Sequence, residues 1–196
     1  MDTKLLISIL LFLTGAFSQF GQNIVQYEDF DWSYIQSRHF DIYYSVNGRT
    51  HADFVAHEAE LAYEHISTHL NWNLKHRVSI IIYNSHNDFQ QTNVIGVYMR
   101  EGIGGVTELY KNRVVIPFDG SNIEFKHVIH HELVHAFIND YIYGGSLKNM
   151  ISSSIKVGIP GWMNEGLAEY LASDWDAKSD MWVRDLAING GEFPLI

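Results

Sequence analysis

Cysteine is absent from the 196 residues of this chain. Disulfide bonds, zinc fingers, thiolate metal sites and a cysteine nucleophile are therefore all excluded. No cysteine follows the N-terminal apolar segment, which excludes attachment of a lipid at that point. The sequence also contains no low-complexity tract and no internal repeat, so a repeat architecture is not expected.

Basic residues are few. The 13 lysines and arginines stand against 23 aspartates and glutamates, and the formal net charge is −10. Removing the first 18 residues leaves this balance unchanged, because Asp2 and Lys4 cancel. An acidic chain is a poor partner for nucleic acid or for an anionic membrane. We therefore expect neither as a partner of the mature chain.

Long hydrophobic runs are missing beyond residue 17. The one apolar run, Leu5–Phe17, is about 13 residues long, which is too short to cross a bilayer comfortably. Lys4 precedes this run, and the small residues Ala16 and Ser18 would precede a cleavage site at Gln19. Residues 1–18 therefore predict a secretory signal peptide and a secreted or periplasmic protein. A retained membrane anchor is the alternative for this segment.

The rest of the chain, about 178 residues, suits one domain of the α+β class. We expect a leader over residues 19–38 and then a small mixed sheet, followed by a mostly helical C-terminal part. Strands are expected at Phe40–Tyr44 and Val78–Tyr83, helices at Ala52–Leu70 and Asn87–Thr92, a hairpin from Gly104–Tyr110 to Arg113–Phe118, and a last helix near Trp175–Ile188. Glu58 is a polar exception on the apolar face of its helix.

The residues with the clearest chemistry are His131, Glu132 and His135, which form an H-E-x-x-H sequence. Positions i and i+4 share one face of a helix, so both imidazoles can reach a single ion. Glu132 is placed to contact a water at that ion without binding the ion itself. This spacing predicts metal-assisted hydrolysis, with Glu132 as the general base.

A chance occurrence is the alternative, because the chain has 11 histidines. The flanking apolar residues argue against it, because they recur at helical spacing and predict a buried helix: Val128, Ile129, Leu133, Ala136 and Phe137. Histidines buried there would need polar partners, which a metal provides. Neighbouring His130 points about 100° away and is expected to be a packed or exposed histidine rather than a ligand.

A third ligand is expected on the helix that follows Pro160, whose buried face is predicted by apolar residues at amphipathic spacing: Trp162, Met163, Leu167, Tyr170 and Leu171. Glu165 and Glu169 lie four residues apart and therefore share a face of that helix. Catalytic zinc commonly takes three protein ligands, here His131, His135 and Glu165. Glu169 would then accept the N–H of a ligand imidazole. The alternative is two solvated glutamates on a surface helix. The metzincin pattern is absent, because Ile138 and Tyr141 occupy its glycine and histidine positions.

With these motifs the chain resembles the gluzincins, zinc peptidases whose third ligand is a glutamate on a second helix. Asn164-Glu165-Gly166 is similar to the Asn-Glu-Gly of aminopeptidase-N-like enzymes, and Glu169 resembles the outer acid of thermolysin-like enzymes. The closer resemblance, over residues 35–190, is to the peptidase-MA-like domain of secreted bacterial proteins, which a TolB-type β-propeller often follows. The stretches His39–Tyr44 and Asn112–Pro117 also support it.

The resemblance implies a zincin-like fold over residues 39–196, in which an edge hairpin packs on the active-site helix. It implies one Zn²⁺, although other divalent ions fit the same ligands. The hairpin segment Gly104–Glu108 would pair with an extended peptide substrate, or it is an ordinary hairpin. Because the chain ends soon after Glu165, we expect a fragment that lacks a C-terminal part, such as the propeller.

The predicted function is that of a secreted zinc-dependent endopeptidase or aminopeptidase. The alternative is a non-catalytic gluzincin-like scaffold in an envelope protein. A transition-state oxyanion needs a further donor, and Tyr141, Tyr143 and Tyr170 are candidates by nearness alone. Glu108 is weakly similar to the amine-binding glutamate of aminopeptidases, and no role is predicted for it.

Overall fold

Five strands form one mixed sheet in the order β1-β2-β3-β5-β4. The computed structural model describes residues 26–94, 102–108, 111–144, 159–173 and 177–189. The strands are β1 (Ser33–Gln36), β2 (Phe40–Tyr44), β3 (Val78–Tyr83), β4 (Val106–Glu108) and β5 (Arg113–Pro117). The three central strands run parallel, and each edge strand pairs antiparallel with its neighbour. The predicted signal peptide, residues 1–18, lies outside the described residues.

Strands β2 and β3 begin and end where their sequence patterns predict. β2 and β3 occupy the expected residues, because Phe40, Ile42, Ile80 and Ile82 alternate toward a fully buried face. Strand β1 lies within the segment expected to be a leader and was not predicted. Its residues are mostly exposed, and it is held by its ladder to β2.

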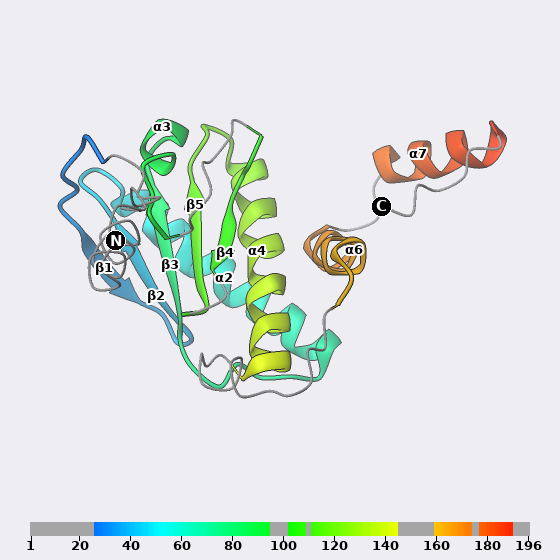
Figure 1. Ribbon diagram of the computed structural model, residues 1–196, viewed down its shortest axis with the longest axis horizontal. Helices are drawn as coiled ribbons and strands as arrows, with labels where there is room; N and C mark the ends of the chain where they lie inside the picture. The colour runs from blue at the N-terminus through cyan, green and yellow to red at the C-terminus, as the bar shows by residue number, and fades with distance from the viewer. Residues whose placement is uncertain (1–25, 95–101, 109–110, 145–158, 174–176, 190–196) are drawn as a thin grey trace, which may run out of the picture.

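Two long helices cover one face of the sheet, namely α2 (Arg49–Leu70) and α4 (Asn122–Tyr143) (Figure 1). Their apolar residues and the sheet form one core, which includes Ile66, Ile116 and Phe137. The short helix α3 (His86–Phe89) packs on the opposite face around Phe89 and Val115.

The polar exception on α2 has partners on α4. Glu58 is buried, and its Oε2 lies 3.2 Å from Nζ of Lys126 and 3.4 Å from Nε2 of His130. Burial lowers the pKa of His130, and the nearby Glu58 carboxylate opposes that shift. His130 therefore packs between the two long helices and faces away from the H-E-x-x-H side, as expected.

The hairpin is anchored to α4 at its turn. Asn112 adopts a left-handed conformation (φ 50°), which asparagine tolerates better than most residues. Its side-chain amide donates to the carbonyl of Ala136 at 3.2 Å, and its Oδ1 accepts from Nδ2 of Asn139 at 2.9 Å. These two bonds join the turn to the middle of α4, so β4 lies along the H-E-x-x-H segment.

Helix α6 (Gly161–Ala172) packs mainly beside α4 and also contacts α2, and α7 (Ala177–Ile188) lies beyond it (Figure 1). Ala168 and Leu171 are the buried residues of α6. The expectation that Trp162, Met163 and Tyr170 would belong to its buried face is wrong, since all three are exposed. The buried face of α6 contacts α4 and is narrower than the face that its apolar residues predict.

The observed fold is the predicted α+β class, a small mixed sheet with an edge hairpin against a central helix, followed by helices. None of the helices in the described ranges is long and apolar enough to cross a membrane.

Candidate metal centre

Helix α4 places the two histidines of the motif side by side. The helix begins after Ser121, whose hydroxyl accepts the backbone N–H of Glu124, and ends at Gly144 with φ 64°. His131 and His135 are one turn apart within it, and their Nε2 atoms lie 3.1 Å from each other. Both rings are partly buried and open toward the same side, where α6 approaches.

Glu165 of α6 completes a group of three. Its Oε2 lies 3.3 Å from Nε2 of His131 and 3.4 Å from Nε2 of His135. The predicted third residue, 30 positions beyond the second histidine, is thus within a few ångströms of both rings. This is the arrangement on which the sequence-based hypothesis depended.

The three distances fit a bound cation. Metal–ligand distances of 2.0–2.1 Å in a tetrahedral site put neighbouring ligand atoms about 3.3 Å apart. The observed values of 3.1, 3.3 and 3.4 Å match that spacing on all three sides. A single hydrogen bond could explain one short contact, but it does not bring three ligand atoms to the same mutual distance. The nitrogen and oxygen donors suit zinc and other divalent transition metals.

The carboxylate of Glu132 lies in the same cleft and is only 7% exposed. Its Oε2 accepts a hydrogen bond from Oγ1 of Thr107 on β4 at 2.7 Å. Burial raises the pKa of Glu132 to about 7; the Thr107 hydroxyl opposes this shift, and the negative charge of Glu165 adds to it. A carboxyl group with a pKa near neutrality can both accept and release a proton at physiological pH.

His135 is held from its other side by Asn164. The amide of Asn164 lies 3.0 Å from Nδ1 of His135. The nearer amide atom is Nδ2, which donates; turning the amide by 180° about its Cβ–Cγ bond would bring Oδ1 there to accept the Nδ1–H of a histidine that uses Nε2 as a ligand atom. Burial lowers the pKa of His135, which favours the neutral form that a metal requires, while the Glu165 carboxylate opposes that shift.

Glu169 lies where the sequence placed it, one turn beyond Glu165 on α6. Its Oε2 is 3.4 Å from Nδ1 of His131, the ring nitrogen opposite the one that faces Glu165. The carboxylate can therefore accept the Nδ1–H of His131 and set the direction of Nε2.

Two residues of the site were not predicted from the sequence. His127 contacts Glu169, with its Nε2 3.2 Å from Oε2, and Thr107 contacts Glu132. The helical spacing of 127, 131 and 135 was a signal for the first, since all three share one face of α4. No sequence pattern indicated Thr107, because its contact with Glu132 joins residues that are far apart in the sequence.

These side chains line a cleft of about 680 Å³ between β4, α4 and α6. Among the three tyrosines proposed as oxyanion donors, Tyr143 lines this cleft. Tyr141 is 60% exposed and packs edge-on against Trp72, and Tyr170 is 72% exposed. Glu108 is buried outside the cleft lining and pairs with Arg113 at 2.9 Å.

The fold and the site define an H-E-x-x-H domain with a glutamate from a second helix. Comparison with protein families matches residues 59–191 to the Peptidase MA superfamily. The chain therefore belongs to the Peptidase MA superfamily, whose members are typically metal-dependent. A search of curated proteins finds no match.

Proposed function

We propose that this protein is a zinc-dependent peptidase. The observation that supports this most strongly is the convergence of His131, His135 and Glu165, whose ligand atoms lie 3.1–3.4 Å apart beside the carboxylate of Glu132. Membership in the Peptidase MA superfamily agrees with this reading. When bound there, the cation supplies a Lewis acid that polarises a peptide carbonyl and lowers the pKa of water.

The proton transfers fall to Glu132. Its carboxylate takes a proton from the attacking water as the water oxygen bonds to the carbonyl carbon. The resulting carboxylic acid then gives that proton to the leaving nitrogen as the C–N bond breaks, which yields an amine and a product carboxylic acid that keeps the second proton of the water. A pKa of about 7 suits both steps, because neither the acid nor the base form is strongly disfavoured near neutral pH.

Strand β4 is the element to which we propose that the substrate binds. This strand is at one end of the described sheet, and residues 103–107 line the cleft opposite α4. An extended peptide can pair with the free edge of such a strand through its backbone. We propose a peptide or protein substrate bound in this way, and no nucleic acid partner. With the apolar N-terminal run and the acidic charge, we further propose a secreted or periplasmic location.

The test uses three proteins, the parent chain, Glu132→Gln and His135→Ala. Zinc content is measured by elemental analysis after equilibration with the metal, and hydrolysis is measured with a library of quenched fluorescent peptides. We expect one zinc per chain in the parent and in Glu132→Gln, and markedly less in His135→Ala. Cleavage is expected only in the parent, because Glu132→Gln keeps the ligands but lacks the base.

Two results would contradict the proposal. Equal cleavage by Glu132→Gln would remove Glu132 as the base. One bound zinc without turnover of any peptide would favour the alternative, a gluzincin-like scaffold that binds metal and does not catalyse.

A further inference from the structure

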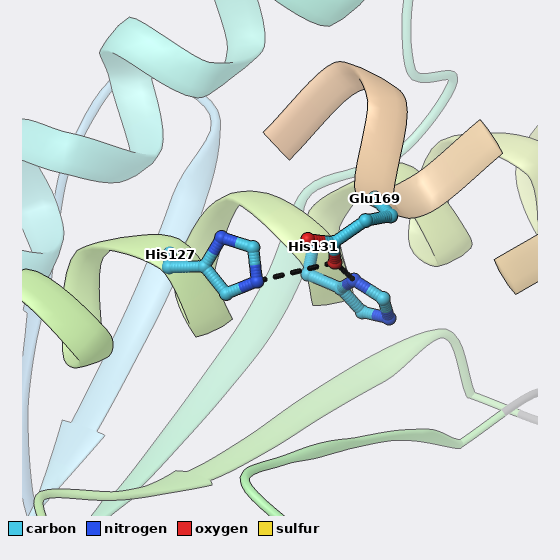
Figure 2. A group of neighbouring side chains, drawn as sticks. All are labelled: His127, His131 and Glu169. Atoms are coloured by element: carbon cyan, nitrogen blue, oxygen red, sulfur yellow. Dashed lines mark ion pairs between the residues drawn. The ribbon is translucent and has the colours of Figure 1, made fainter. Parts of the chain in front are cut away.

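His127 reaches the carboxylate that also contacts His131. Oε2 of Glu169 lies 3.2 Å from Nε2 of His127 and 3.4 Å from Nδ1 of His131. Figure 2 shows the carboxylate of Glu169, which comes from α6, between the two rings that project from α4. One glutamate oxygen therefore links two histidines that are a helical turn apart.

Ser173, the residue directly after α6, contacts both His127 and Glu169. Its Oγ lies 3.0 Å from Nδ1 of His127 and 3.5 Å from Oε1 of Glu169. His127 thus has a polar partner at each ring nitrogen. Glu169 lies on α6 and Ser173 directly follows it, so the ring of His127 joins α4 to α6 beside the metal centre.

The positions of the protons follow from the chemistry of each ring. If His131 uses Nε2 as a ligand atom, its Nδ1 carries a proton and donates to Glu169. A neutral His127 has one N–H, and on Nε2 it also donates to Glu169. Its Nδ1 then accepts the single hydroxyl proton of Ser173 across the shorter contact of 3.0 Å, in competition with Oε1 of Glu169 at 3.5 Å. In this pattern, each contact of the His127 and His131 rings pairs one hydrogen-bond donor with one acceptor.

The contact with His127 matters because the side chain of Glu169 is 59% exposed. With a contact to His131 alone, the long side chain of Glu169 would keep several competing rotamers, and holding the one that orients the His131 ring would cost entropy. The contact with His127, a ring that projects from α4 and is 32% exposed, restricts Glu169 to the position that His131 requires.

We propose that His127 is a positioning residue of the metal centre, which holds Glu169 where it accepts the Nδ1–H of His131. This inference rests on the proposed function, because it requires His131 to bind a cation. His127 acts through Glu169 and is not itself a ligand.

The same atoms could in principle hold a second cation, since the ligand atoms of His127, His131 and Glu169 lie within 4.8 Å of one another. That arrangement requires His131 to bind metal through both nitrogens and to lose its Nδ1 proton. The shared carboxylate acceptor needs no such loss, so the observations favour the hydrogen-bonded form.

The experiment measures zinc affinity by competition with a chromophoric chelator in four proteins, the parent, His127→Ala, His127→Gln and His57→Ala. We expect His127→Ala to bind zinc about tenfold more weakly, at the low end of the usual 10- to 100-fold effect of such partners. His127→Gln should regain most of the affinity, because its amide N–H replaces Nε2–H. His57 lies exposed on α2 and serves as the control for loss of an imidazole.

The visible absorption of the cobalt-substituted proteins gives a second readout, since it reports the geometry of the bound metal. Parent-like zinc affinity in His127→Ala would overturn the role of His127 and leave the metal centre intact. No zinc binding by the parent would overturn the metal centre itself, and this inference with it. Two zinc ions per chain, with one lost in His127→Ala, would overturn the hydrogen-bonded form in favour of a second cation site.

Discussion

Thr107 and Glu132 are joined by a hydrogen bond of 2.7 Å, from Oγ1 of the edge strand to Oε2 on the active helix. The same hydroxyl lies 2.9 Å from the carbonyl oxygen of Glu132. The strand that borders the cleft therefore also sets the position of the carboxylate that we propose as the base.

Replacing Thr107 by valine should raise the pKa of Glu132 further. The hydroxyl opposes the effect of burial, and a hydrogen bond to a charged group contributes about 1.5–3 kcal/mol, or about 1–2 pH units. The measurement is a carbon NMR titration of the glutamate carboxyl groups in metal-free protein. Thr107→Ser keeps the hydroxyl and should titrate like the parent. Identical titrations in the valine and serine variants would show that the bond does not affect Glu132.

The raised pKa of Glu132 also predicts a pH-dependent stability of the metal-free protein. Folding raises this pKa from 4.5 to about 7, so the folded state binds the proton more tightly than the unfolded state. The stabilisation is fully present below pH 4.5 and is lost as the pH rises through 7. The difference amounts to about 3 kcal/mol.

Glu132→Gln removes this titration. In metal-free protein the variant should therefore gain stability over the parent at pH 8, by up to about 3 kcal/mol, and little at pH 4.5. Urea unfolding at both pH values measures the difference. A gain of the same size at both pH values would mean that ionisation of Glu132 is not its cause.

Gly105, the residue before β4, lies close to α4, and its replacement by alanine should destabilise the fold. A Cβ there would lie 2.9 Å from Cγ of Glu132 and equally close to side-chain carbons of Ile116 and Val128. Such overpacking costs about 1–3 kcal/mol. In α6, Gly166 has space for a Cβ in the described structure, so Gly166→Ala should instead stabilise by about 0.5–1 kcal/mol. Thermal unfolding of both variants tests this contrast.

Zinc should stabilise the parent against unfolding, because the three ligands come together only in the folded chain. At a free concentration of about 100 times the dissociation constant, the gain is about 2.7 kcal/mol. Glu132→Gln should gain as much, and His135→Ala should gain little. Each protein is compared with itself after chelator treatment, which removes the effect of the substitution alone. A full gain in His135→Ala would place the bound zinc elsewhere.

Several elements of the fold follow from local sequence. The residues of β2 and β3 were predicted because alternating apolar side chains specify a buried strand. Strand β1 was missed because its side chains are mostly exposed, and its pairing with β2 decides its conformation. On α6, Trp162 and Tyr170 misled the prediction of the buried face, since their hydrophobicity does not reveal which side contacts α4.

The sequence by itself determined the pair of histidines, because a spacing of four residues on a helix is a local geometric property that needs no other part of the chain. Glu165 and Glu169 shared a face for the same reason. Only the tertiary structure decided that α6 brings these carboxylates to the imidazoles, that His127 meets Glu169, and that Thr107 meets Glu132. Those contacts join segments distant in the chain, and they depend on how helix and strand surfaces pack, which helical periodicity does not encode.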